Sequence, residues 1–279
     1  MRRLVTIVGA LAAISTWPAC ATHTKARDAD QSRIRYQLAA DDFRGQRPEA
    51  ALEELRKALE IDPENADAYN LLGLIALSQG AEYVRQVETA GCLRGADAES
   101  LRRDAMTKFH EAEGHLRKAT ALRPTFSDAW NNLAVAALQL ESYDEAVSAA
   151  QNALKDVAYQ SPELARANLG WAQFHQKDLN AAWKALHEAV ARLPGFCVGR
   201  YRLAKVYVER GQYDEAADEI DAVVSNPACP IQEAFLLGGL VHQHRGDAAG
   251  ARALFDRCVS IASRACLATE CRRYTGMVQ

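Results

Sequence analysis

The sequence predicts an all-α solenoid, in which about six helix-turn-helix repeats stack side by side and one further helix caps the C-terminal end. Three observations carry this prediction. Amphipathic helical segments recur at a spacing of about 34 residues. No stretch alternates polar and apolar residues as a half-buried strand would. Alanine is the commonest residue, whereas aromatic residues make up only 7%, a balance that suits closely packed helices better than a β-sandwich or barrel.

The composition excludes several classes of protein. Hydrophobic residues make up 49% and charged residues 25% of the 279 residues, as in a folded globular chain. The 33 Lys and Arg residues are balanced by 36 Asp and Glu residues, so there is no electrostatic case for nucleic-acid binding. The motifs of serine hydrolases, zinc proteases, P-loop proteins and dinucleotide-binding proteins are absent from the sequence. We therefore expect a protein that binds other proteins and is not an enzyme, with no metal, cofactor or small-molecule substrate.

Residues 1–19 have the pattern of a secretory signal peptide. Two arginines precede the uncharged apolar run of residues 4–16, which is shorter than the roughly 20 residues of a membrane-spanning helix. The segment ends before Cys20, which resembles the lipobox cysteine that is acylated in bacterial lipoproteins. The resemblance implies a lipid anchor at Cys20, a polar tether over residues 20–31 and, because Ala21 follows, sorting to the outer membrane. In the alternative, ordinary cleavage nearby leaves Cys20 as a thiol or removes it.

The repeats show themselves most clearly in small residues at fixed positions. They start near Ser32, Ala66, Ser127, Glu163, Cys197 and Gln232. Three positions in each repeat are small, as closely crossing helices require, and only Val223 is an exception: Ala39, Ala51, Ala58; Gly73, Ala112, Ala119; Ala134, Ala146, Ala153; Gly170, Ala182, Ala189; Ala204, Ala216, Val223; Gly239, Ala251, Cys258. The pattern, clearest in Trp130-Asn131-Asn132-Leu133-Ala134, resembles the tetratricopeptide repeat. The resemblance covers residues 32–263 and implies a concave surface lined by the first helix of each repeat.

Two segments depart from the regular pattern. About 27 residues, 80–106, are inserted between the helices of the second repeat, which predicts that both helices extend beyond the array. Residues 91–95 look like the tip of this extension, and Asp97 is a candidate N-cap for a returning helix over 100–122. After the sixth repeat, residues 264–279 are expected to form a capping helix and tail that cover the last apolar face.

Six cysteines follow Cys20, and an even number is typical of disulfide bonding in an oxidising compartment. They are Cys92, Cys197, Cys229, Cys258, Cys266 and Cys271. Cys258 and Cys271 lie on either side of an expected turn, so a helical hairpin would bring them together; the other pairings stay open. No pair has the CxxC spacing of zinc or redox sites. His242 and His244 do not suggest a chelating pair, because helical side chains two residues apart point to different sides.

By resemblance to the tetratricopeptide family, positions 2, 5, 9 and 12 of each first helix face the concave side. The residues expected there are Tyr36, Phe43, Asn70, Leu74, Leu77, Asn131, Val135, Leu138, Trp171, Phe174, Tyr201, Lys205 and Val208. Aromatic anchors in such a stripe suit a peptide-binding hot spot; in the alternative, each side chain packs between helices. The Lys/Asn/Arg clamp of cytosolic chaperone cofactors is missing, so an apolar strand or helix is favoured over an acidic peptide terminus.

The signal peptide, Cys20 and the tandem repeats together resemble the tetratricopeptide lipoproteins that act as pilotins for type IV pilus secretins. The resemblance implies an outer-membrane lipoprotein that faces the periplasm, binds secretin subunits and promotes their multimerisation. A generic periplasmic scaffold for an envelope or cell-wall complex is the main alternative. A thiol enzyme that uses Cys92 is a remote one.

Overall fold

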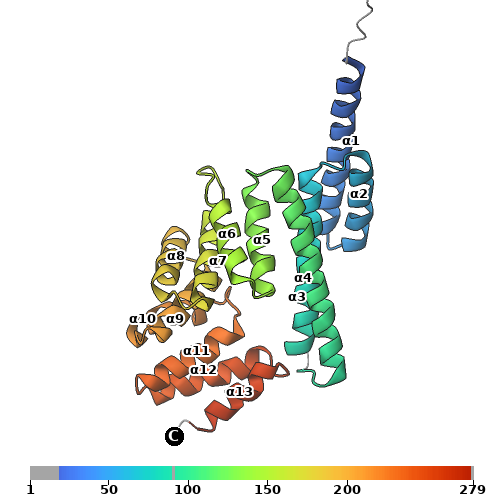
Figure 1. Cartoon of the computed structure of the whole chain (residues 1–279). Helices are drawn as coiled ribbons and strands as arrows, with labels where there is room; N and C mark the ends of the chain where they lie inside the picture. The colour runs from blue at the N-terminus through green and yellow to red at the C-terminus, as the bar shows by residue number, and fades with distance from the viewer. Residues whose placement is uncertain (1–18, 90–91, 278–279) are drawn as a thin grey trace, which may run out of the picture.

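Helix pairs stacked in a curved row form the body of the molecule (Figure 1). The structure, a computed structural model, describes residues 19–89 and 92–277, with side chains from residue 26 onward. Its described residues form thirteen α-helices and no strand: α1 (Ala19–Arg44), α2 (Pro48–Ile61), α3 (Ala66–Glu88), α4 (Ala96–Leu122), α5 (Ser127–Gln139), α6 (Tyr143–Ala153), α7 (Pro162–His175), α8 (Leu179–Arg192), α9 (Cys197–Glu209), α10 (Tyr213–Val224), α11 (Gln232–His244), α12 (Ala248–Ile261) and α13 (Cys266–Thr275). The all-α solenoid predicted from the sequence is therefore confirmed.

The predicted signal peptide lies outside the described residues except for its last residue, and so do residue 90 and Gly91, the first residue of the predicted tip. The side chain of Cys20 is also outside them. Within the described ranges, no helix combines the length and the apolar character that crossing a membrane requires.

Each odd-numbered helix from α1 to α11 packs against the even-numbered helix that follows it, and that second helix packs against the next pair. All eighteen small-residue positions read from the sequence are buried in this stack. A Cβ atom on Gly73 would lie 2.5 Å from Leu116, and one on Gly239 would lie 2.3 Å from Phe255. The small residues therefore let large side chains of the partner helix pack directly against the backbone.

Local signals in the sequence explain where several helices begin. Asn65, Asp178 and Asp247 each accept a hydrogen bond from a backbone N–H in the first turn of α3, α8 and α12, respectively. Pro48 and Pro162 stand in the first turns of α2 and α7, where a missing N–H costs nothing.

Helix α1 begins much earlier than the first repeat predicted from Ser32. It runs from Ala19, so the stretch expected to be a polar tether, residues 20–31, belongs to this helix. The segment contains three Ala and no Gly or Pro, so nothing in it stops a helix. Figure 1 shows this end of α1 standing free beyond α2.

The insertion in the second repeat extends both of its helices, as the sequence predicts. Helices α3 and α4 run past their neighbours as a long hairpin towards the C-terminal helices (Figure 1). The N-cap of α4 is Gly95, at φ 72°, and not Asp97, which lies inside the first turn. The prediction was wrong here because glycine adopts this backbone conformation easily, and the helix starts earlier than residue 100.

Three disulfides link the six cysteines that follow Cys20. Cys92, at the tip of the α3–α4 hairpin, is bonded to Cys266 at the start of α13, across 174 residues of sequence. Cys197 is bonded to Cys229, and Cys258 to Cys271, the pair that the helical hairpin suggested. Helix α13 covers the last repeat, where Tyr274 stacks on Phe255 with ring centroids 5.3 Å apart.

Candidate functional site

The concave side of the array contains an apolar hollow near its N-terminal end. Four of the residues expected in the stripe, Phe43, Leu74, Leu77 and Val135, line a hollow of about 410 Å³ together with Ser78. They come from α1, α3 and α5, so the stacking of the first three repeats creates the hollow. This part of the predicted stripe does form a concave apolar surface.

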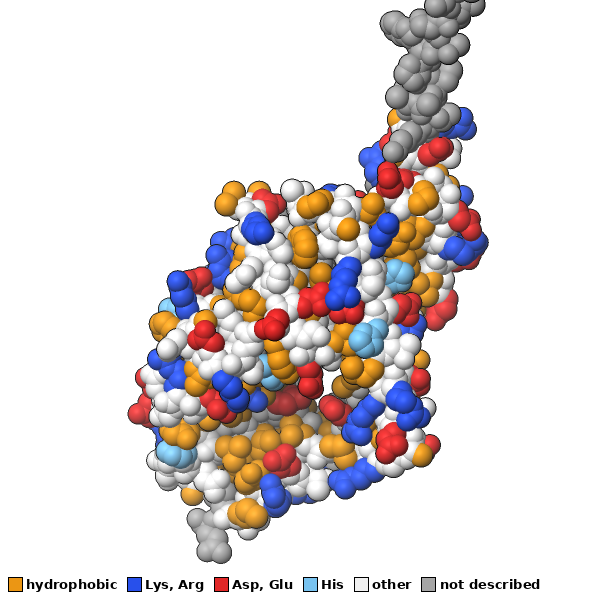
Figure 2. All heavy atoms as spheres, in the orientation of Figure 1, with side chains coloured by type: hydrophobic (Ala, Val, Ile, Leu, Met, Phe, Trp, Pro, Cys, Tyr) orange, Lys and Arg blue, Asp and Glu red, His pale blue; other side chains and the backbone are white. Residues whose placement is uncertain are grey.

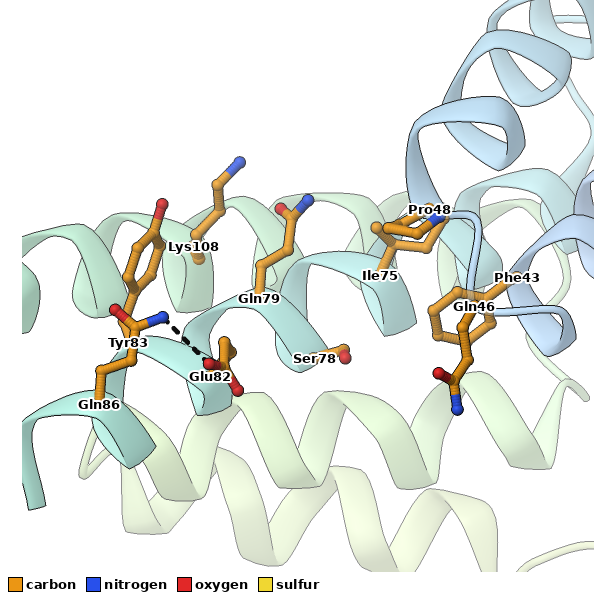
Figure 3. A pocket seen from close by; sticks show the side chains of 10 residues that line it. All are labelled: Phe43, Gln46, Pro48, Ile75, Ser78, Gln79, Glu82, Tyr83, Gln86 and Lys108. Carbon is orange, nitrogen blue, oxygen red and sulfur yellow. Dashed lines mark hydrogen bonds between the residues drawn. The ribbon is translucent and has the colours of Figure 1, made fainter. Parts of the chain in front are cut away.

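A larger hollow of about 820 Å³ adjoins this one and shares Phe43 and Ser78 with it. It forms where the first repeat ends and the longer α3–α4 hairpin continues. Figure 3 shows Gln46, in the turn after α1, at one end of the hollow, a row of side chains along α3 that includes Glu82, and Tyr83 and Lys108 towards the other end. In that row Gln86 donates a 3.0 Å hydrogen bond to Glu82. Amide and hydroxyl groups at the rim of an apolar floor can bind the backbone of an extended peptide.

The two asparagines of the predicted stripe are used inside the protein. Asn132 donates a 2.9 Å hydrogen bond to Oδ1 of Asn70, and Asn168 donates a 3.0 Å bond to Oδ1 of Asn131. Both Asn70 and Asn131 are buried. Because these bonds join consecutive repeats, the amides hold the first helices in register, and the prediction that they face a ligand needs this correction.

An aromatic cluster occupies the middle of the array. The Trp171 and Phe174 rings stack with centroids 4.9 Å apart, and His175 contacts both rings and stacks on Tyr143. Phe174 is only 6% exposed and belongs to the core, so it does not present an anchor to a partner. Trp171 is partly exposed and remains available at the surface.

The other stripe residues pack mainly between helices. Tyr36, Leu138, Tyr201 and Val208 are half-buried against separate core clusters. Burial raises the pKa of Tyr201 to about 12 and also raises the pKa of Tyr36. These side chains contribute stability first, as the packing alternative proposed.

The repeat pattern alone does not single out three further residues, Arg202, Ser78 and Tyr83. Arg202 donates 3.1 Å and 3.2 Å hydrogen bonds to Oδ1 of Asn168 and the carbonyl of Ala167. Asn132, Asn168 and Arg202 stand at the same place in consecutive repeats, and this repeat spacing could have identified them. Ser78 and Tyr83 lie on the part of α3 beside the insertion, where repeat positions no longer apply.

The described residues contain no cluster of three or more His, Cys, Asp or Glu side chains that could hold a metal ion. Cys92, the nucleophile of the thiol-enzyme alternative, is bonded to Cys266 and therefore has no free thiolate. His242 contacts Asp221 and Asp247, while His244 stacks on Tyr213, so the two histidines do not act together.

Comparisons with known families agree with this geometry. A TPR repeat model matches residues 42–80, and tetratricopeptide repeat models match residues 98–161, 173–226 and 201–265. Together they cover more than half of the chain. The chain therefore belongs to the tetratricopeptide-repeat proteins. No curated protein matches it.

Two solved structures share the fold over almost their whole length. PilW, described as a widely conserved type IV pilus biogenesis factor, has a TM-score of 0.67 at 21% identity, covering 86% of this chain and 97% of PilW. PilF of Pseudomonas aeruginosa has a TM-score of 0.67 at 19% identity, covering 88% of this chain and 98% of PilF. YrrB, a TPR protein described as having an unusual peptide-binding site, has a TM-score of 0.50 at 18% identity, with 78% and 97% covered.

Proposed function

We propose that this chain is a pilotin, an outer-membrane lipoprotein that binds secretin subunits and promotes their assembly for type IV pilus biogenesis. The observation that carries the proposal is the match to PilW and PilF along nearly their entire chains. The leader that ends before Cys20 supports the anchor, because acyl chains contribute about 0.8 kcal/mol per buried CH₂ without any spanning helix.

The concave surface over α3 supports a mechanism based on binding alone. An exposed apolar segment of a secretin subunit would lie against Phe43, Leu74 and Leu77, with its backbone bonded to the amides at the rim. Anchoring at Cys20 would hold this surface beside the membrane into which the secretin inserts. Such tethering raises the effective concentration of the two partners.

The proposal is tested by deleting the gene and restoring it with variants. Deletion should abolish pili and leave the secretin monomeric. Ser78→Arg should fail to restore multimers, because Ser78 is exposed and lines both hollows, so a long cation there blocks them without disturbing the core. A Cys20→Ala chain should leave the membrane fraction. The readouts are secretin multimers on gels, pilus counts and membrane fractionation.

Ser148→Arg is the matched control, because Ser148 is exposed on the second helix of its pair, α6, outside both hollows. It should restore multimers fully. Normal multimers with Ser78→Arg would remove the concave surface from the mechanism. Intact pili with envelope defects after deletion would instead support the generic periplasmic scaffold.

A further inference from the structure

Arg202 is a largely buried cation whose partners carry no charge. Nη1 bonds to Oδ1 of Asn168 and to the carbonyl of Ala167, and the guanidinium carbon lies 5.3 Å from the centre of the Trp171 ring. By contrast, Arg200 on the same helix forms an ion pair with Glu219. Burial lowers the pKa of Arg202 to about 10. A buried cation without a carboxylate is costly, which makes this position unusual.

Two lysines add to the charge around the same aromatic cluster. Nζ of Lys205 lies 5.6 Å from the centre of the Trp171 ring and 5.8 Å from that of Phe174, and Nζ of Lys177 lies 5.7 Å from Phe174. Arg202 and Lys205 are three residues apart on α9 and therefore share a face. Among the described residues, no ion pair includes either of these side chains or Lys177. Arg202 and Lys205 thus lie side by side against the indole of Trp171, and neither is paired with any acidic side chain that the structure describes.

The acidic groups nearby do not neutralise this cluster. Glu233 acts electrostatically on Tyr201, and Glu141 on His175, but neither forms an ion pair with the cations. Burial and then the charge of Lys205 lower the pKa of His175, with smaller contributions from Lys177 and Arg202. Lys205, Lys177 and Arg202 thus place positive charge around His175, opposed only in part by Glu141, although the whole chain carries a net charge of −3.

The position of the Arg202, Lys205 and Trp171 cluster in the array favours an acidic side chain inside a peptide over a terminal carboxylate. The cluster lies on α7 and α9, the first helices of their repeats. Helix α5 packs against α7 on one side, and α11 packs against α9 on the other. Asn131 and Asn168 connect the cluster, repeat by repeat, to the N-terminal half of the array. A peptide bound along the concave side can therefore extend in both directions past the cluster, and its C-terminus need not lie there.

We propose that Arg202, Lys205 and Trp171 form a subsite for an acidic side chain within an extended peptide segment, with an apolar neighbour of that residue against the indole. This inference deepens the proposed function, because it rests on the concave side binding a polypeptide. The carboxylate supplies the charge that Arg202 lacks, and a charge-assisted bond in a partly dry site is strong. The partner segment is thus apolar but carries Asp or Glu at one position, which adds to the purely apolar ligand expected from the sequence.

The test uses the purified, oxidised chain and a phage library of random twelve-residue peptides whose C-termini are fused to the coat protein. Selected peptides should contain Asp or Glu beside an apolar residue. The best one, made with acetyl and amide ends, should bind about tenfold more weakly when its acidic residue becomes Gln. Lys205→Gln should weaken binding to a similar degree, and combining both changes should cost less than the sum.

Lys184→Gln is the matched control, because Lys184 is exposed on α8, the second helix of its pair, and should leave affinity unchanged. The side chain of Lys205 makes no hydrogen bond to the described part of the chain, so its variant should keep the circular dichroism spectrum. The proposal is overturned if no peptide is selected, if the acidic residue can be replaced without loss, or if only a free C-terminal carboxylate binds. Because these readouts need no secretin, they can fail while pilus assembly still depends on the protein, and the reverse also holds.

Discussion

Gly170 lies where α7 crosses α8, and a side chain there has no space. A Cβ atom would lie 2.7 Å from Leu186 and 2.9 Å from the carbonyl oxygen of Ala182, which cannot rotate away. We expect Gly170→Ala to reduce the free energy of unfolding by about 1–3 kcal/mol, the usual cost of overpacking. Urea denaturation followed by circular dichroism measures it.

Gly114 provides the matched control for this prediction. It is exposed inside α4, and a Cβ atom there would meet nothing within 4 Å. Gly114→Ala should therefore stabilise the protein by about 0.5–1 kcal/mol, since alanine restricts the unfolded chain and favours the helix. If both substitutions changed stability in the same direction, the argument from helix crossings would fail.

His242 on α11 connects this helix to α10 and to the N-cap of α12 through its two ring nitrogens. Nδ1 lies 2.8 Å from Asp247, the N-cap of α12, and Nε2 lies 3.0 Å from Asp221 on α10. Burial alone would lower the pKa of His242, but the hydrogen bonds and charges of the two carboxylates outweigh burial and raise it. A raised folded-state pKa gives stability that is present below the ordinary value of 6.5 and is lost as pH rises through the folded value.

We therefore expect His242→Gln to cost more stability at pH 5.5 than at pH 8.5. Unfolding curves of both proteins at the two pH values give the difference, and the comparison cancels the titration of groups that do not contact His242. His187, for which the structure shows only stacking on Trp183, serves as the control position. A difference that stayed constant with pH would show that the charge of His242 does not contribute.

Individual residues differ in how well the sequence could place them. The small residues were predictable because each helix crossing imposes the same steric limit, and the repeat multiplies the signal. Whether a stripe residue faces solvent was not predictable, because the curvature of the stack decides it. Phe174 is covered by its neighbours, whereas Leu74 lines an open hollow, although both follow from the same repeat rule.

Among the elements, the helix pairs and the long α3–α4 hairpin follow directly from the sequence pattern. The start of α1 does not, because the polar stretch before Ser32 carries no repeat signal and its composition suggests a tether. The pairing of Cys92 with Cys266 could not be predicted either, since six cysteines allow 15 connectivities and sequence alone cannot choose among them. Only the nearby pair Cys258 and Cys271 could be suggested from local geometry.

The disulfide between the hairpin and α13 should be a strong stabiliser of these elements. It closes 174 residues, whereas the bond between Cys197 and Cys229 closes 32. In the chain-entropy account, the longer closure stabilises the fold by about 1.5 kcal/mol more than the shorter one. Replacing Cys92 and Cys266 with Ser should thus lower the urea midpoint further than replacing Cys197 and Cys229.

Equal midpoints for the two double variants would contradict this expectation and would indicate that the hairpin tip contributes little to the folded state. Circular dichroism in the absence of urea should show full helicity for both variants, because the helices pack through their own core clusters.

At the scale of the whole molecule, the sequence predicts an open curved ribbon. The structure adds a covalent link between the α3–α4 hairpin and the C-terminal helix. The α3–α4 hairpin leaves the second repeat and meets the C-terminal cap, so the chain between them forms a covalently closed circuit. Figure 2 shows the surface hollowed between the end of this hairpin and the C-terminal helices, with basic and acidic side chains interspersed over the visible face. The hairpin and the C-terminal helices therefore border the concave side and leave it open.

The disulfide between Cys92 and Cys266 has a mechanical consequence for a chain that is pulled at both ends. A pull between the N-terminus and the C-terminus would travel through the sulfur–sulfur bond and bypass repeats three to six. The 174 residues between Cys92 and Cys266 comprise helix α4 and repeats three to six; they would otherwise extend by roughly 600 Å but stay folded under load. Only the first helices and the short C-terminal segment would unravel while the bond is intact.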